Sequence, residues 1–420
     1  MDTSIKKKST QGFVLAFLSL QDDRAKPKGS RDPLGFELIW THYGRMVIGN
    51  LTTVTSSLSN FAVALLGFKW ANELCAHLPD VERQAQVRES FLRFEQLTGY
   101  LRYLAGDRRL MGITRVAKRM QDTSIAVSLG MHADQSILSD QASYGMWGLY
   151  SSAMRDTGLV HGEERSITAL GGPIVGRIEA KLDKQSMFDL IQKSGKLKAS
   201  ALQEHAASFL KAIENKPIQK SLVELLMGGN ERNLVQQELW QLTRKMRVDG
   251  ELKVDVADFI ENIESKTKNM ELKDRLIEIE QIERLLVATN NLFHYCRRKD
   301  GENLNDIESA IKAKNYSYSH ISTTQSYAKL PHATLLETIR ATLLAGDNRQ
   351  ALIAIFDLNK RVMEQRGGAP WVELESNQCL RVRVPSETSE LRTQEQLVRD
   401  WDYEYFFTSY LNIANQAPVS

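Results

Sequence analysis

Cysteine is scarce in this 420-residue sequence, which contains only Cys75, Cys296 and Cys379. An odd number of widely separated cysteines excludes a disulfide framework and a paired-cysteine metal site. Cys75 lies in an apolar run, which favours a buried structural thiol. The unpaired cysteines, and the lack of a small-residue cleavage site after the short apolar stretch Gly12–Leu20, argue against secretion. We therefore expect a cytoplasmic protein.

Long hydrophobic runs are also missing. A membrane-spanning helix requires roughly 20 consecutive apolar residues, and no segment approaches that length. The longest candidate, Phe61–Cys75, is interrupted by Lys69, Asn72 and Glu73. We therefore expect no membrane among the partners of this chain.

No charge of one sign predominates, because 54 Lys and Arg residues face 52 Asp and Glu residues, for a net charge of +2. This balance excludes the strongly basic composition of a histone-like protein, although it leaves room for a local basic face. The charged fraction is 25% and the hydrophobic fraction is 42%. These fractions are those of folded soluble proteins, so the chain can bury a substantial core.

Catalytic and cofactor motifs are absent too. The eight histidines form neither an HExxH motif nor a His–Cys ligand spacing. The glycine pairs at Gly171-Gly172 and Gly228-Gly229 lack the other residues of a phosphate-binding loop. We therefore expect no cofactor, no bound metal and no catalytic residue.

Two carboxylate patterns have structural explanations. Glu179 and Lys181 have the E-x-K spacing of a metal-dependent nuclease core. Such a core needs these residues on a strand, whereas the sequence predicts a helix here, so a divergent nuclease stays open as an alternative. Glu373–Glu375 presents two carboxylates on one face of a predicted strand. Arg381 and Arg383 on the partner strand favour cross-strand ion pairs there over a metal site.

What the sequence does contain is helical periodicity. The stretch Glu82–Leu104 has apolar residues three and four positions apart, which predicts an amphipathic helix. A long apolar stripe predicts another helix over Leu272–Cys296. Alternating apolar and polar residues over Trp371–Val384 predict a two-stranded hairpin. The polar face of the first helix carries Arg83, Arg88, Arg93 and Arg102.

These patterns predict a mainly α fold, with a winged-helix-like N-terminal region and a helical C-terminal domain that carries a small β-hairpin. Near Leu182 the composition shifts from Gly- and Ser-rich sequence to helix-forming residues, which predicts a domain boundary. The predicted parts are a flexible tail (1–12), a helical domain (13–182) with a winged-helix-like module (107–182), and a helical domain (183–420) with a hairpin (371–384).

The module at 107–182 has the order of elements found in the latter half of a winged helix-turn-helix. Asp140 is placed to cap a helix that ends at Gly158, a residue suited to the left-handed conformation of a C-cap. The chain then forms a short hairpin with its polar tip at residues 161–165. A small-residue turn follows, and it leads into a further helix over Ile174–Leu182.

A module of this kind can bind DNA through basic and polar side chains, which contact phosphates and base edges. The charge distribution supports this reading, because residues 1–182 carry a net charge of +4 and the remainder carries −2. Basic residues precede the long helix of the module, and polar residues lie on its expected outer face and in its wing. The predicted DNA contacts are Arg108, Arg109, Arg115, Lys118, Arg119, Gln141, Ser143, Tyr144, Ser151, Ser152, Arg155 and Arg165.

Three segments carry a resemblance to known sequences, namely Arg45–Thr53, Ser139–Tyr150 and Arg155–Val160. In these segments the chain resembles an uncharacterised bacterial family that is encoded in antiviral defence islands beside ATPases and nucleases. The similarity covers residues 1–180 and the Trp371–Val384 hairpin. Because no motif in it has a known chemical role, it implies no active residue. It implies phage defence as the context, and ATPase or nuclease subunits as protein partners.

The sequence therefore predicts a non-enzymatic, DNA- and/or protein-binding subunit of a bacterial antiviral complex. Two alternatives stay open. One is a pure protein scaffold or adaptor, because winged helices also dock proteins and because Asp140, Asp156, Glu163 and Glu164 would repel DNA phosphates. The other is the divergent nuclease.

Overall fold

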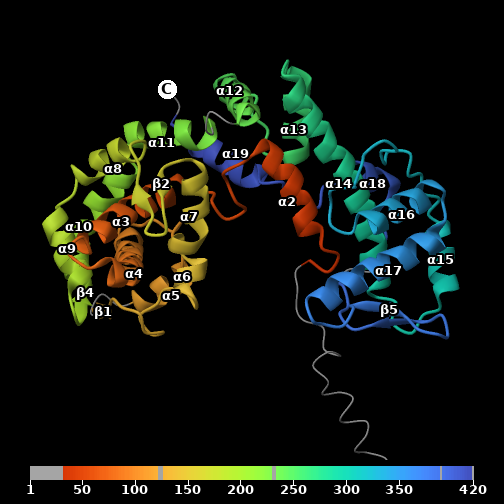
Figure 1. Cartoon of the computed structure of the whole chain (residues 1–420), viewed down its shortest axis with the longest axis horizontal. Helices are drawn as coiled ribbons and strands as arrows, with labels where there is room; N and C mark the ends of the chain where they lie inside the picture. The colour runs from red at the N-terminus through yellow and green to blue at the C-terminus, as the bar shows by residue number, and fades with distance from the viewer. Residues whose placement is uncertain (1–31, 122–125, 229–232, 388–389, 419–420) are drawn as a thin grey trace, which may run out of the picture. The chain divides into compact units, whose positions relative to one another are not determined.

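The computed structural model describes residues 32–121, 126–228, 233–387 and 390–418. These residues form a mainly α-helical structure with three short antiparallel strand pairs (Figure 1), which confirms the mainly α part of the expected fold class. Within the described ranges, no helix combines the length and the apolarity needed to cross a membrane. The expected tail at residues 1–12 and the apolar stretch after it lie outside the described residues.

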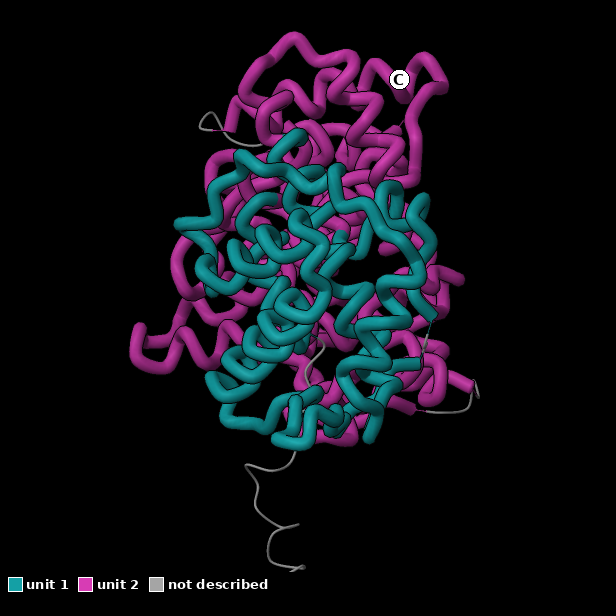
Figure 2. The backbone as a smooth tube through the Cα atoms, turned by 90° about the vertical axis from the view of Figure 1, so that its right-hand side faces the viewer, with its two compact units in different colours: residues 1–43, 276–403 teal, residues 44–275, 404–420 magenta. Residues whose placement is uncertain are grey.

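The chain divides into two compact units, which Figure 2 shows in different colours. Unit 1 contains residues 1–43 and 276–403, and unit 2 contains residues 44–275 and 404–420. The chain passes between them inside helix α2 (Phe36–Val47), inside helix α14 (Met270–Cys296) and after Tyr403. The boundary expected near Leu182 falls inside unit 2, because helices on both sides of it pack together there.

Unit 1 is built on the C-terminal part of α14, whose predicted apolar stripe is fully buried. Its hairpin joins β5 (Val372–Leu374) to β6 (Leu380–Val382), as predicted from the alternating pattern. Glu373 forms an ion pair across the hairpin with Arg383, at 2.8 Å between oxygen and nitrogen, as expected. The other helices of unit 1 are α15 (Leu304–Lys312), α16 (Ala333–Leu344), α17 (Asn348–Gln365) and α18 (Gln394–Arg399).

Unit 2 is centred on α3 (Leu58–Leu74) and α4 (Asp80–Leu104), which pack against each other. Helix α3 is buried nearly all round, which is why its sequence is apolar on every side. Cys75 follows it and is buried, as expected. The remaining helices of unit 2 are α5 (Ile113–Arg119), α6 (Gln141–Tyr144), α7 (Met146–Asp156), α8 (Gly172–Glu179), α9 (Lys184–Gln192), α10 (Ala199–Ile213), α11 (Lys216–Gly228), α12 (Leu234–Val248), α13 (Val256–Lys266) and α19 (Phe407–Gln416).

The C-terminal part of the chain forms two helices, α18 and α19, and its helical conformation is interrupted between them. Tyr405 and Phe406 interrupt it, with positive φ angles of 46° and 68°. Both side chains are buried, which holds the backbone in this uncommon conformation. A Cβ atom at Gly44 would lie only 2.8 Å from the Tyr405 carbonyl oxygen, so glycine is required at that position.

The predicted order of helix, hairpin and helix is present between α7 and α8. Gly158 has a φ of 77°, the left-handed conformation expected of it. The hairpin pairs β2 (Val160–His161) with β3 (Ser166–Ile167). Strand β1 (Ala126–Ser128) pairs with β4 (Lys196–Lys198) and not with this hairpin, so the hairpin is a two-stranded ribbon.

Candidate nucleic-acid interface

Helix α7 is fixed by aromatic packing on its inner side. Trp147, Tyr150 and Met154 all point into unit 2 and are at most 6% exposed. The Trp147 ring meets Phe68 of α3 and Phe91 of α4 edge-on, with centroids 5.8 and 5.4 Å away. Edge-to-face contacts at these distances are favourable for aromatic pairs. The opposite side of α7 is therefore held outward on a well-packed support.

The N-terminus of α7 is capped by the buried carboxylate of Glu95. The Met146 N–H donates to Glu95 Oε1 at 2.6 Å, and Gln141 Nε2 donates to Oε2 at 2.8 Å. Burial raises the pKa of Glu95 to about 7, although both hydrogen bonds act against the rise. A Cβ atom at Gly145 would lie 2.7 Å from both carboxylate oxygens, so only glycine fits above this group.

This cap divides the helix that the sequence predicted from Asp140 to Gly158. Asp140 does cap its beginning, since its carboxylate accepts from the Ser143 N–H. The helix then stops after four residues, because Gly145 adopts an extended conformation beside Glu95. Helix α7 begins at Met146, so the single helix that was expected is two helices.

Gln141 is the first residue for which the predicted exposure is wrong. It is only 4% exposed, and its Nε2 donates to the Leu92 carbonyl and to Glu95. Its Oε1 accepts from Gln96 Nε2 at 3.0 Å. All of these partners lie on α4, so Gln141 joins α6 to the core and cannot reach a nucleic acid.

Ser151 is the second such residue. Its side chain is buried, because it lies one helical turn after Trp147 on the inner face of α7. The Ser151 hydroxyl donates to the Trp147 carbonyl and accepts a hydrogen bond from Arg165 Nε at 2.9 Å. Ser151 therefore anchors an arginine of the hairpin instead of contacting DNA itself.

The basic residues of α5 hold the loop that follows it. The Arg119 guanidinium donates to the carbonyls of Gln135 and Ser136, at 2.7 and 2.8 Å, and to the Tyr100 hydroxyl at 3.0 Å. Arg115 donates more weakly to the same Ser136 carbonyl, at 3.3 Å. These two predicted DNA contacts are therefore committed largely to structural hydrogen bonds.

The neighbouring arginines are also engaged. Arg109 pairs with Asp107 at 3.0 Å and with Glu214, and Arg108 stacks on the Tyr103 ring at 4.0 Å from its centroid. Lys118 is exposed on the outer side of α5. The predicted basic cluster is therefore accessible in part, but only Arg109 among these residues has carboxylate partners, and the other arginines hold neutral carbonyls or a ring.

Arg102 was expected on the polar face of α4, and this expectation is wrong. Its side chain has no exposed surface. Its guanidinium donates to Asp107 at 2.8–2.9 Å and to Asn60 Oδ1 at 2.6 Å. Burial alone would raise the pKa of Asp107, but the charge and hydrogen bonds of Arg102 hold that pKa below its usual value. The pair is a structural element of the core.

A different group of arginines meets beside α7. Arg165 lies at the hairpin tip with a φ of 55°, and its guanidinium stacks 3.8 Å from the Trp147 ring centroid. Its partial burial, together with the positive charges of Arg155 and Arg88, lowers the pKa of Arg165 to about 10. We call Arg88, Arg155 and Arg165 the arginine face.

The arginine face combines residues from α4, α7 and the β2–β3 hairpin. Arg88 and Arg155 are exposed, and neither forms an ion pair with any residue that the structure describes. Ser152 lies on the same side of α7 as Arg155, one turn earlier. Sequence reasoning missed Arg88, since only the fold brings α4 beside the hairpin.

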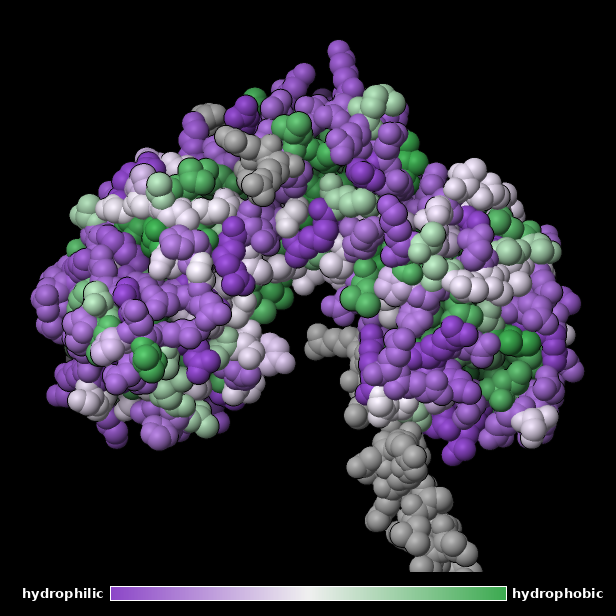
Figure 3. Space-filling view, in the orientation of Figure 1, coloured by the Kyte–Doolittle hydropathy of each residue, from purple (hydrophilic) through white to green (hydrophobic). Residues whose placement is uncertain are grey.

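Two more predicted residues are accessible on α6. Ser143 is exposed, and the Tyr144 side chain is 61% exposed, which is unusual for tyrosine. Figure 3 shows that the visible surface of unit 2 over α4–α10 is mostly hydrophilic, with separate hydrophobic residues. Predicted contacts that remain available to a ligand are therefore Ser143, Tyr144, Ser152, Arg155, Arg165 and Lys118.

Three of the four acidic residues expected to repel phosphates have local partners, and the fourth, Asp156, is exposed next to Arg155 and close to the charge of Arg45. Glu163 accepts from Gln84 Nε2 at 2.6 Å, and Glu164 pairs with Arg83 at 3.4 Å. Both contacts join the hairpin tip to α4. Asp140 is used as the cap of α6. These roles give the acidic side chains local partners and steady the hairpin beside the arginine face.

Glu179 of the E-x-K pattern lies in α8, where a helix was expected. It accepts hydrogen bonds from Trp70 Nε1 at 2.9 Å and from Lys184 and Lys69. Although burial opposes ionisation, these donors lower the pKa of Glu179 to about 2. Among the described residues, no group of three or more His, Cys, Asp or Glu side chains is arranged to hold a metal ion.

No protein-family model, curated protein or solved structure matches this chain. The functional argument therefore rests on the geometry of the site. In that geometry the arginine face stands out, because it gathers three like charges on a well-packed support and exposes two of them.

Proposed function

We propose that this chain is a non-enzymatic DNA-binding subunit of a cytoplasmic, bacterial antiviral complex, and that its α7–hairpin region acts as a winged-helix-like module. The observation that carries the proposal is the arginine face. The resemblance of Arg45–Thr53, Ser139–Tyr150 and Arg155–Val160 to a defence-island family supports the antiviral context. It also suggests ATPase or nuclease subunits as the protein partners.

The physical argument concerns the cost of keeping like charges together. Burial is the main cause of the lowered pKa of Arg165, and the positive charges of Arg155 and Arg88 lower that pKa further, so the three guanidiniums carry an unfavourable concentration of like charge. A phosphate placed between them relieves this repulsion and forms charge-assisted hydrogen bonds. Arg165 is already oriented by Trp147 and Ser151, so little of its side-chain freedom is lost on binding.

The same geometry predicts a limited footprint. Three arginines can neutralise two or three phosphates, and each released counter-ion adds about 0.9 to the slope of log affinity against log salt. Binding should therefore have a slope of roughly −2 to −3, together with little preference for sequence. Tyr144 and Ser143 are accessible for additional contacts, as expected for residues near such a surface.

The test is the affinity of the purified chain for a short duplex DNA, measured by fluorescence anisotropy over a range of salt concentrations. The Arg88→Glu/Arg155→Glu variant should bind at least tenfold more weakly, with a smaller salt slope. A matched control is Lys211→Glu/Lys253→Glu, which changes the net charge equally at two exposed lysines elsewhere in unit 2. The control should change affinity less than threefold.

Two results would overturn the proposal. One is the absence of duplex binding by the unmodified chain at low salt, where phosphate contacts are strongest. The other is an equal loss of affinity in both variants, because that would assign binding to net charge alone. Either result would favour a protein scaffold without nucleic-acid contact.

A further inference from the structure

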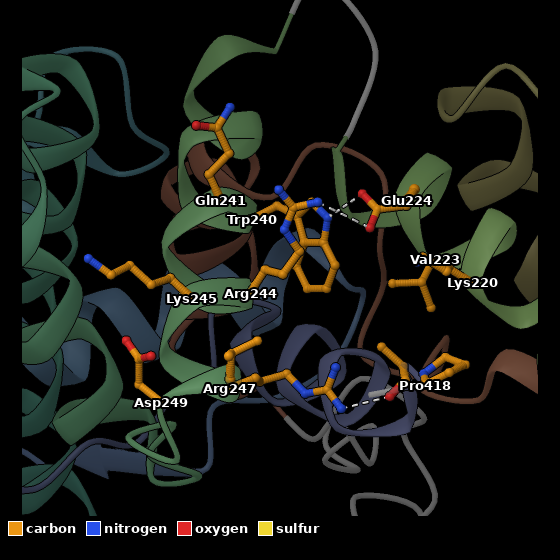
Figure 4. Close-up of a pocket in the computed structure, with 12 residues that line it drawn as sticks. Lys220, Val223, Glu224, Trp240, Gln241, Arg244, Lys245, Arg247, Asp249 and Pro418 are labelled. Atoms are coloured by element: carbon orange, nitrogen blue, oxygen red, sulfur yellow. Dashed lines mark hydrogen bonds and ion pairs between the residues drawn. The ribbon is translucent and has the colours of Figure 1, made fainter. Parts of the chain in front are cut away.

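The arginines that line the cavity between α11 and α12 have local partners. Arg244 Nη1 lies 3.5 Å from Glu224 Oε1, and Arg247 donates to a backbone carbonyl of the C-terminal segment at 2.6 Å (Figure 4). The arginine face differs from this cavity, because Arg88 and Arg155 are exposed and form no ion pair with any residue in the described ranges. The surroundings of the arginine face indicate which form of DNA it can bind.

Carboxylates lie at the borders of the arginine face. The charge of Arg88 acts on Asp140, at the start of α6. At the C-terminal end of α7, the charge of Arg155 acts on Asp156. A duplex carries one phosphate for about every 1.7 Å of its axis, so a duplex laid along the face brings several phosphates close to these carboxylates. A short run of phosphates on a flexible strand can bind the arginines and then turn away from the carboxylates, which avoids their repulsion.

Tyr144 provides an exposed ring beside these arginines. It ends α6, whose four residues span only about 6 Å from the cap Asp140, so Tyr144 lies close to Arg88. Three residues after Tyr144 comes Trp147, on whose ring Arg165 stacks. The Tyr144 side chain is 61% exposed, and its ring packs on no other aromatic ring of the described chain. The ring is therefore available to a flat ligand.

The backbone of α7 is open between Tyr144 and Ser152. Gly148 is exposed, and a Cβ atom there would collide with the Ser143 carbonyl oxygen, so the position accepts only glycine. Ser152 lies one turn after Gly148 and is partly exposed, and Arg155 follows three residues later. A nucleic-acid strand can therefore approach α7 closely on the side that carries these residues.

From this arrangement we propose that the arginine face binds the junction between duplex DNA and a single-stranded overhang. The inference rests on the proposed DNA binding and adds the form of DNA that is preferred. Phosphates beside the junction lie on Arg88, Arg155 and Arg165, and the first unpaired base stacks on Tyr144. A base inside a duplex is stacked on its neighbours and cannot offer its flat face to the ring, whereas an unpaired base can. Because every base has such a face, the preference depends little on sequence.

The experiment compares a blunt duplex with the same duplex carrying a short thymine overhang, by fluorescence anisotropy with the full chain at low salt. The overhang duplex should bind at least about fivefold more tightly, as expected for the stacking of one base on an aromatic side chain. Tyr144→Ala should reduce this preference to less than about twofold, and Tyr144→Phe should retain it, because Phe keeps the ring. Leu234→Ala is the matched control, since it removes a similarly exposed side chain from α12, and it should keep the preference.

The outcomes distinguish this inference from the proposed function. Equal affinities for the two duplexes overturn the junction inference and leave DNA binding at the arginine face in place. An overhang preference that survives in Tyr144→Ala overturns it as well, because the base would then lie elsewhere. If neither duplex binds, the proposed function fails and this inference fails with it. If circular dichroism shows that Tyr144→Ala is not folded, Tyr144→Leu, which keeps an apolar side chain without a ring, should lose the preference in its place.

Discussion

Unit 2 contains two groups of arginines that have the same formal charge and opposite surroundings. Arg102 and Arg109 donate to carboxylates, and Arg119 donates to backbone carbonyls, so the N–H groups of these arginines are used within the fold. Arg88 and Arg155 are exposed and form no ion pair with a described residue, although the charge of Arg88 acts on Asp140 and that of Arg155 acts on Asp156. The contrast shows that a cluster of basic residues in a sequence indicates a basic surface only where the fold offers no internal acceptors.

The strongest test of this contrast is Arg102→Met. The substitution keeps much of the side-chain volume but leaves Asp107 and Asn60 without their buried donor. Breaking a buried ion pair from one side costs about 3–5 kcal/mol, and the remaining contact of Asp107 with Arg109 places the expected loss near the lower value. Urea unfolding measures it. A loss below about 1 kcal/mol would contradict a structural role.

Glu95 supports the arginine face from behind, and its pKa makes a prediction about pH. In the fold this pKa is about 7, and the ordinary value is 4.5. The folded state therefore retains a proton that the unfolded chain releases, so the contribution of Glu95 to stability declines as pH rises from about 4.5 to about 7.

The size of this effect is measurable. Each pH unit in that window costs at most about 1.4 kcal/mol, for a total of roughly 2–3 kcal/mol. Denaturant unfolding at pH 5, 6, 7 and 8 should show this decline in the parent chain. The decline should be smaller in Glu95→Gln, which cannot ionise. Parallel pH profiles for the two proteins would show that another group is responsible.

A smaller loss is expected for Arg119→Ala. The substitution removes donors from the Gln135 and Ser136 carbonyls and from the Tyr100 hydroxyl, in a region that is partly buried. Net hydrogen-bond contributions of about 1 kcal/mol each, partly replaced by water, give an expected loss of about 1–2 kcal/mol. Lys118→Ala, one residue earlier and exposed, is the matched control and should change stability by less than about 0.5 kcal/mol.

The smallest effect is predicted for Arg155→Ala. Because this side chain is exposed and repels Arg165, its removal should change the free energy of unfolding by no more than about 0.5 kcal/mol. DNA affinity should fall in the same variant. The comparison between the two arginine groups fails if Arg155→Ala destabilises the chain more than Arg119→Ala does.

Features that depend on local sequence were predictable. The hairpin at 371–384 follows from alternation, the long helix α14 follows from its apolar stripe, and the conformation of Gly158 follows from its place at a helix end. In each case the signal and the structure lie within a few residues of one another. The mainly α class follows from the same kind of signal.

Features that depend on distant partners were not predictable. Glu95 divides the helix at Gly145 from 50 residues away, and Asn60 helps to bury Arg102 from another helix. Arg88 joins the candidate site only because α4 packs beside the hairpin. The division into units has the same cause, since residues 276–403 interrupt the sequence of unit 2. The periodicity and composition of a segment do not indicate which distant residues will contact it in the fold.

That interruption has a consequence for biosynthesis. Helix α19 belongs to the core of unit 2, where the Tyr410 hydroxyl bonds to Thr243 and Phe407 packs on Phe259. The ribosome makes α19 only after it has made residues 276–403, which belong to unit 1. The apolar surface of unit 2 that α19 covers therefore stays exposed until residues 276–403 have been translated. During that interval it is a surface that chaperones of nascent chains can cover.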